Sequence, residues 1–105
     1  MTITTAGTTI QNKQINGCVD VEAPNVTIKN SRIICNDTAL FIGDGSTSGF
    51  LIQDSEVSCN GHHGTGIGPQ NYTALRVNVS ACENGFWAEH NSTIQDSYIS
   101  RPHRL

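Results

Sequence analysis

The most concentrated reactive side chains lie in the segment CNGHHGTGIG, at residues 59–68. His62 and His63 stand next to each other between glycines, and Glu83 and His90 follow further along the chain. Imidazoles together with a carboxylate suit Zn²⁺ or a similar divalent ion, which lowers the pKa of bound water to about 7. The sequence therefore predicts a metal site with His62, His63 and His90 as ligands, and with Glu83 as a general base or a further ligand.

An exposed histidine turn that binds no ion is the competing interpretation of this segment. Successive side chains of an extended chain point in opposite directions, so His62 and His63 reach one ion only if the turn bends them together. His90 lies at a different edge of the expected fold, so it can join the site only through a folded loop or across a subunit interface. Both interpretations stay open at the level of the sequence.

A repeat of about twenty residues must position these side chains, because it covers almost the whole chain. Each copy has an apolar or small anchor, a polar residue, usually Asn or Asp, usually Ser, a polar residue and an apolar residue. The copies are TTIQNKQI (8–15), VTIKNSRI (26–33), FLIQDSEV (50–57), YTALRVNV (72–79) and STIQDSYI (92–99). The anchors are Ile10, Ile28, Ile52, Ala74 and Ile94, and the apolar residues five places later are Ile15, Ile33, Val57, Val79 and Ile99. Such a period is typical of a solenoid, in which each repeat stacks on its neighbours.

Each copy is expected to form one strand, followed by a turn and a second short strand. The candidates for the second strand are CVDV (18–21), ALFI (39–42), TGIG (65–68) and GFWA (85–88). Parallel pairing of equivalent strands places equivalent residues in columns with a spacing of about 4.8 Å, and the apolar columns face inward. Glu83 then follows His63 in one column, since each lies eleven residues before the next anchor. Trp87 aligns with Ile67, which predicts that it fills the core rather than stacks on a sugar ring.

Two polar columns accompany the anchors. The column two residues after the anchors contains Asn12, Asn30, Asp54, Arg76 and Asp96, and the column three residues before them contains Asn25, Asn71 and Asn91. Stacked amides can hydrogen-bond from coil to coil, so these residues are expected to have a structural role. Calcium binding by Asp54, Glu56 and Asp96 is the weaker interpretation, because Arg76 lies between Asp54 and Asp96 and favours a ladder of surface ion pairs.

The cysteines follow the same repeat. Cys18, Cys35, Cys59 and Cys82 each lie seven or eight residues after an anchor. Free thiols pack as small buried apolar groups, so we expect an inward-facing column of free cysteines. Disulfides between stacked coils are the alternative, and a zinc–thiolate site is the least favoured interpretation because the chain has no C-x-x-C pair.

Length, composition and charge limit the possible functions. A chain of 105 residues is expected to form a single domain, at residues 1–105. The net charge is −3 and the six Lys and Arg are dispersed, which argues against a nucleic-acid partner. We expect no membrane partner, because no run of about 18 apolar residues occurs. The opening residues have no signal-peptide pattern, and the compartment stays open.

The pattern I-x-[ND]-S-x-[IV], with G-I-G and G-F-W between copies, resembles the right-handed parallel β-helix family. This family includes pectate-lyase-like proteins, other polysaccharide-processing enzymes and phage tail spikes. The resemblance covers residues 8–99 and implies an all-β fold, a right-handed parallel β-helix of about five coils. The chain has fewer coils than the catalytic members usually carry, and Arg101–Leu105 does not fit the repeat. We therefore expect a short or truncated β-helix, with no residue assigned to the role of a lyase base.

Two functions compete at this level. The first is a metal-dependent hydrolase of ester or phosphoester bonds, with a divalent ion such as Zn²⁺ as its cofactor. The second is a noncatalytic module that binds a glycan or another small ligand, or that only assembles. In either case we expect a homo-oligomer, formed through the open coil ends or a sheet face, because terminal coils bury one face only.

Overall fold

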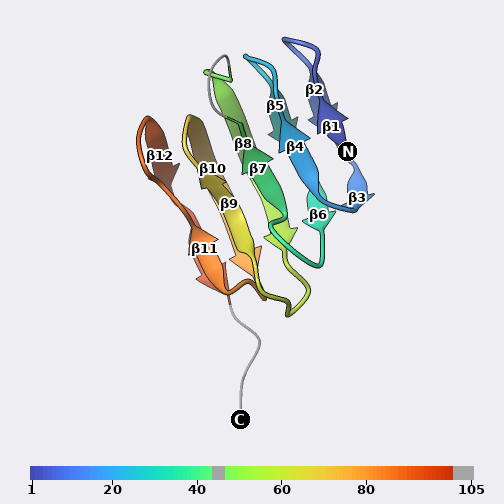
Figure 1. Cartoon of the computed structure of the whole chain (residues 1–105), viewed down its shortest axis with the longest axis vertical. Coiled ribbons are helices and arrows are strands. Elements are labelled where there is room, and N and C mark those ends of the chain that lie inside the picture. Colours follow the sequence, from blue (N-terminus) through green and yellow to red (C-terminus); the bar gives the residue numbers. More distant parts are fainter. Residues whose placement is uncertain (44–46, 101–105) are drawn as a thin grey trace.

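Figure 1 shows the computed structural model of the chain, which describes residues 1–43 and 47–100. Within these residues the regular elements are all β-strands, and none of them is a helix that could cross a membrane. The chain winds alternately through two parallel sheets that lie face to face (Figure 1). The result is a β-solenoid of about five turns, which confirms the predicted fold class. The tail at residues 101–105, which was expected not to fit the repeat, lies outside the described residues.

Each turn of the solenoid contributes to both sheets. Sheet A has the strand order β1 (Thr2–Ile3), β4 (Val19–Val21), β7 (Leu40–Ile42), β9 (Thr65–Pro69) and β11 (Asn84–Phe86). Sheet B contains the repeated segments, which we number as coils 1 to 5. These are β2 (Thr9–Gln11) with β3 (Gln14–Asn16), β5 (Thr27–Lys29) with β6 (Arg32–Ile34), β8 (Phe50–Ser58), β10 (Tyr72–Ser80), and β12 (Ser92–Gln95) with β13 (Tyr98–Ser100).

The strand register confirms both apolar columns of the repeat. The first column pairs Ile10, Ile28, Ile52, Ala74 and Ile94 in sequence order, and the second pairs Ile15, Ile33, Val57, Val79 and Ile99. The members from coils 2, 3 and 4 are completely buried. They face a third column from sheet A, formed by Val19, Leu40 and Ile67. The core is therefore a stack of apolar layers that runs along the solenoid axis.

The prediction for Trp87 is wrong by one position. Phe86, rather than Trp87, pairs with Ile67, and Phe86 packs against the core. Neighbouring residues in a strand face opposite sides, so the one-residue shift turns Trp87 outward, where 47% of it is exposed.

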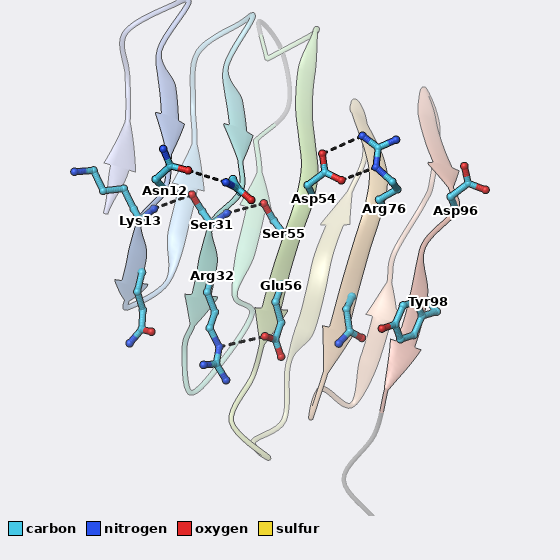
Figure 2. A pocket seen from close by; sticks show the side chains of 13 residues that line it. Asn12, Lys13, Ser31, Arg32, Asp54, Ser55, Glu56, Arg76, Asp96 and Tyr98 are labelled. Atoms are coloured by element: carbon cyan, nitrogen blue, oxygen red, sulfur yellow. Dashed lines mark hydrogen bonds and ion pairs between the residues drawn. The ribbon is translucent and has the colours of Figure 1, made fainter.

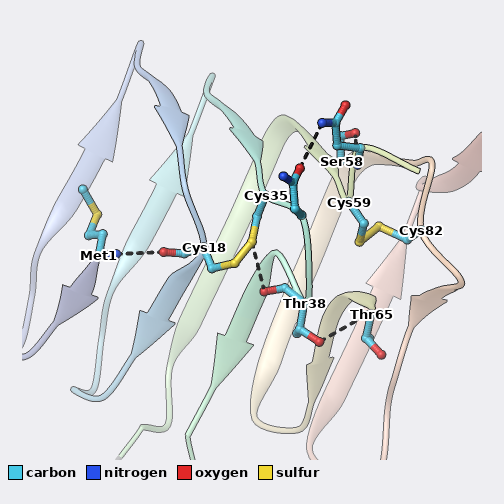
Figure 3. The surroundings of a disulfide bond; sticks show 10 residues. Met1, Cys18, Cys35, Thr38, Ser58, Cys59, Thr65 and Cys82 are labelled. Carbon is cyan, nitrogen blue, oxygen red and sulfur yellow. Dashed lines mark hydrogen bonds between the residues drawn. A yellow bond between two sulfur atoms is a disulfide. The ribbon is translucent and has the colours of Figure 1, made fainter. Parts of the chain in front are cut away.

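The expectation of free cysteines is also wrong. Cys18 is bonded to Cys35 and Cys59 to Cys82, and no cysteine is free. Figure 3 shows both bridges, each of which joins one coil to the next near the ends of sheet B strands. The Cα atoms are 4.9 Å and 4.7 Å apart, which is the separation of neighbouring strands in a sheet and also suits a disulfide. In-register stacking therefore brings each pair of thiols to bonding distance.

We expect each disulfide to stabilise the fold by about 3 kcal/mol, because it closes a loop of 17 or 23 residues in the unfolded chain. Urea unfolding of the Cys59→Ala/Cys82→Ala double variant should show a loss of this size relative to the unmodified protein. Intact mass after alkylation in denaturant without reductant checks the pairing directly. Alkylation of all four cysteines in the unreduced protein would contradict both bridges.

Candidate functional site

An open groove of about 630 Å³ lies across the outer face of sheet B. Figure 2 shows that side chains from all five coils line it, from Lys13 in coil 1 to Tyr98 in coil 5. The lining is polar and charged throughout, with amides, hydroxyls, guanidinium groups and carboxylates. The groove crosses the strands, so an extended ligand lying in it would meet each coil in turn.

A bend in every coil of sheet B shapes this groove. The bend falls on the polar column at Asn12, Asn30, Asp54, Arg76 and Asp96, whose φ angles lie between 50° and 58°. Asn and Asp tolerate this left-handed region better than other residues with a side chain, which explains why the repeat favours them two places after the anchor. Arg76 is the exception, and its position is held by an ion pair instead of an amide contact.

The serine of the repeat satisfies the backbone at the bend. Ser31 Oγ accepts a hydrogen bond from the Lys13 N–H at 3.2 Å, and Ser55 Oγ accepts one from the Ser31 N–H at 3.1 Å. Ser97 Oγ accepts one from the Val77 N–H at 2.9 Å. Each hydroxyl thus accepts a hydrogen bond from the preceding coil, at the point where the bend interrupts the ladder of backbone hydrogen bonds. Ser31 and Ser55, which line the groove, therefore have a structural role at the bend.

The polar column forms the structural ladder that was predicted. Asn30 Nδ2 donates to Asn12 Oδ1 at 2.8 Å, and Arg76 Nη2 donates to Asp54 Oδ2 at 2.9 Å (Figure 2). The hydrogen bond from Arg76 and its positive charge lower the pKa of Asp54, and the same contacts raise the pKa of Arg76. The charge of Asp96 raises the pKa of Arg76 further. The ion pair between Asp54 and Arg76 is therefore present as predicted, and Asp96 acts on Arg76 through its charge alone. The pair engages Asp54, one of the carboxylates of the calcium interpretation.

A second column of side chains projects into the groove two residues beyond the bend. It contains Gln14, Arg32, Glu56, Asn78 and Tyr98. Arg32 Nε lies 3.3 Å from Glu56 Oε1, and Tyr98 is 63% exposed. Sequence reasoning missed Tyr98 as a functional candidate. Its outward position could have been read from the repeat, because it directly precedes the inward-facing Ile99.

The histidine turn lies between β8 and β9, away from this groove. His63 Nδ1 is 3.2 Å from Glu83 Oε1, so the two residues do share a column as predicted. Their side chains are 93% and 57% exposed. His62 Nδ1 instead lies 3.1 Å from the carbonyl oxygen of Asn60, its neighbour in the same turn.

His90 is not close to the other proposed ligands. It precedes β12, whereas His62 and His63 follow β8, and these parallel strands are joined in register through β10. The start of one strand and the end of the other therefore lie at opposite ends of sheet B. Within residues 1–43 and 47–100, no three His, Cys, Asp or Glu side chains gather closely enough to hold a metal ion.

The remaining aromatic residues divide between core and surface. Tyr72 is buried, and its hydroxyl donates to the carbonyl oxygen of Trp87 at 3.0 Å. Burial raises the pKa of Tyr72 to about 12. Trp87 is thus available at the surface, whereas Tyr72 is not.

Comparison of the chain with protein-family models, with curated proteins and with solved structures gives no match. The fold class rests on the strand topology, and the function must be judged from the surface itself.

The ion pair between Asp54 and Arg76 should make stability depend on pH in acid. The folded protein holds the pKa of Asp54 below its usual value of 3.8, so the contribution of the pair is complete above that pH and is lost as the pH falls through the lowered pKa. We expect Asp54→Asn to lower the melting temperature at neutral pH, and the gap from the unmodified protein to narrow as the pH falls below the usual pKa of 3.8. Asp20→Asn, on β4, controls for the loss of one carboxylate. A gap that stays constant as the pH falls in this way would contradict the assignment.

Proposed function

We propose that this protein is a noncatalytic carbohydrate-binding module on a β-helix scaffold. The observation that supports it is the polar groove across all five coils, which ends at the exposed ring of Tyr98. Sugars offer many hydroxyl groups and apolar ring faces. A row of hydrogen-bonding side chains with an aromatic ring at one end matches both features.

The spacing of the groove favours a chain-like ligand. Equivalent side chains repeat from coil to coil at about 4.8 Å, so the column from Gln14 to Tyr98 presents five polar side chains in a line. A compact ligand would contact only two or three of them. An oligosaccharide that runs along the solenoid axis would contact most of them.

The charge of the groove favours a neutral ligand. Lys13, Arg32 and Arg76 are opposed by Asp54, Glu56 and Asp96 in the lining, so the formal charges cancel. Two of the three cations are already paired with carboxylates. A strongly acidic polysaccharide would have to compete with these pairs, whereas a neutral one would use the amide, hydroxyl and aromatic groups.

The repeat pattern and the β-solenoid together support a relationship to pectate-lyase-like, polysaccharide-processing β-helix proteins. That fold carries many different activities, so the relationship supports the ligand class and not a reaction. The two disulfides fit this proposal, since disulfides persist in oxidising compartments outside the cytosol.

Glycan-array screening followed by calorimetry tests the proposal. We expect binding of neutral oligosaccharides, and we expect Tyr98→Ala to weaken it roughly tenfold because an aromatic anchor is lost. Phe41→Ala is the matched control, because Phe41 is 41% exposed on sheet A, and its affinity should equal that of the unmodified protein. Equal losses in both variants, or no glycan bound at all, would rule out this groove as the site.

A metal-dependent hydrolase is the second candidate, on the contact between His63 and Glu83. These two groups supply fewer than the three protein ligands of a typical catalytic zinc site, so His90 would have to come from another molecule. If the site exists, tag-free protein with added zinc will show chelator-sensitive ester hydrolysis that His63→Ala and His90→Ala both abolish. Unchanged activity in these variants, or no metal uptake by elemental analysis, would eliminate it.

A further inference from the structure

Both ends of the solenoid leave apolar columns uncovered within the described residues. In coil 5, Ile94 and Ile99 are 40% and 45% exposed, whereas the residues that pair with them in coil 4 are fully buried. In coil 1, Ile10 and Ile15 are only partly buried. β12 and β13 pair with β10, and β2 and β3 pair with coil 2, each on one side. Each end thus presents an apolar strip beside strand edges.

Four hydrogen bonds between Asn, Arg and Asp side chains at the corners of the solenoid run in one direction. In each of them the later coil donates and the earlier coil accepts. They are Asn30 Nδ2 to Asn12 Oδ1 at 2.8 Å, Asn60 Nδ2 to Asn36 Oδ1 at 2.9 Å, Arg76 Nη2 to Asp54 Oδ2 at 2.9 Å, and Asn91 Nδ2 to Asn71 Oδ1 at 3.3 Å. In coil 1, Asn12 Oδ1 accepts from coil 2, so the bend column begins with the Nδ2 group of Asn12 as a donor. It ends in coil 5 with Asp96, whose carboxylate can only accept.

At the position one place before the anchor, the backbone N–H also donates from the later coil to the earlier coil. The Thr27 N–H donates to the Thr8 carbonyl at 2.9 Å, and the Leu51 N–H donates to the Val26 carbonyl at 3.0 Å. Both bonds join a residue one place before an anchor to the residue two places before the preceding anchor. The next bond of this series, beyond coil 5, would be made to the carbonyl of Ser92. The equivalent donor in coil 1 is the Thr9 N–H.

We propose that a second copy of this chain places its coil 1 on coil 5, so that molecules stack head to tail. In this arrangement Asn12 of the second copy donates to Asp96, and its Thr9 N–H donates to the Ser92 carbonyl. Its apolar columns continue those that Ile94 and Ile99 leave open. The occupant is a copy of this chain because its first coil has donors, apolar columns and a strand register that match the acceptors, apolar columns and register of coil 5.

The proposed interface joins two different surfaces, so it does not close on itself. Each added molecule exposes a new coil 5, and the assembly extends as a linear stack. It leaves the groove on sheet B open, and the stack would extend that groove from one molecule to the next. The inference does not depend on carbohydrate binding.

Sedimentation velocity over a range of protein concentrations tests the stacking. We expect the weight-average sedimentation coefficient of the unmodified protein to rise with concentration. Asn12→Asp still accepts from Asn30 Nδ2 but removes the outward donor and opposes a carboxylate to Asp96, so it should weaken association roughly tenfold. Asn36→Asp adds the same charge in the middle of the solenoid and should associate normally. Adding Asp96→Asn to Asn12→Asp should restore the contact, because the donor and acceptor are then exchanged.

A mixing experiment tests the direction of the stack. Gln11→Pro blocks the free strand edge of coil 1. The backbone groups of Thr8 and Asn12 bond to coil 2, and backbone groups alternate in direction along a strand, so the Gln11 N–H points to the free edge. Proline removes this N–H. Ile99→Lys blocks coil 5. Each variant alone should stay monomeric, and an equal mixture should form dimers and nothing larger, because one intact end of each type remains. Circular dichroism and melting temperature verify that both variants are folded.

Three results would overturn the inference. The first is an unmodified protein that remains a monomer at every concentration. The second is an equal effect of Asn12→Asp and Asn36→Asp, which would indicate a response to net charge alone. The third is dimer formation by either blocked variant by itself, which would indicate a contact between two identical ends.

Discussion

In-register parallel pairing between successive coils is the constraint on which the rest of the structure depends. It fixes each residue directly above its equivalent in the preceding coil, so one choice of residue is repeated along a column. An inward-facing column must then be apolar in every interior coil. Each fully buried Ile or Val contributes about 2 kcal/mol to this stacking. The same constraint brings paired cysteines, stacked amides and ion pairs to contact distance without any further design of the loops.

The bend in sheet B is the feature that converts stacking into a shaped surface. It requires a left-handed residue, and the residue after it loses part of its ladder to the neighbouring coil. The pair Asn/Asp–Ser stabilises the bend in two ways. The first residue tolerates the left-handed φ angle, and the hydroxyl of the second accepts a hydrogen bond from an N–H of the preceding coil. Coil 4 departs from this pair at Arg76 and Val77. The ion pair to Asp54 holds Arg76, and the N–H of Val77 still donates to the serine hydroxyl of the next coil, Ser97, as in coils 1 and 2.

The sequence predicts correctly those features that depend only on the register of the coils. The anchor columns and the contact between His63 and Glu83 depend only on counting residues from an anchor, and both predictions hold. The prediction for Trp87 is wrong because sheet A has no such anchor. A shift of one residue in the register then reverses the direction of the Trp87 side chain. The cysteines were correctly placed in neighbouring coils, but spacing does not distinguish two packed thiols from a disulfide. The groove was missed because it depends on the bend, and a left-handed φ is not visible in a hydrophobic pattern.

Columns also decide what kind of site this scaffold can build. The inner column after the bend contains only Ile and Val, whereas the adjacent outer column changes from amide to cation, carboxylate, amide and phenol. Outward positions carry no packing constraint, so they can vary from coil to coil, but they point in nearly the same direction.

A metal ion needs ligands that converge from several sides, and a flat row of parallel side chains does not supply them. Convergence must come from a turn, and the turn at His62 and His63 brings only His63 to Glu83. A row of unlike polar groups at regular intervals suits instead a ligand that is itself a chain. The scaffold therefore favours recognition along its length over chemistry at a point.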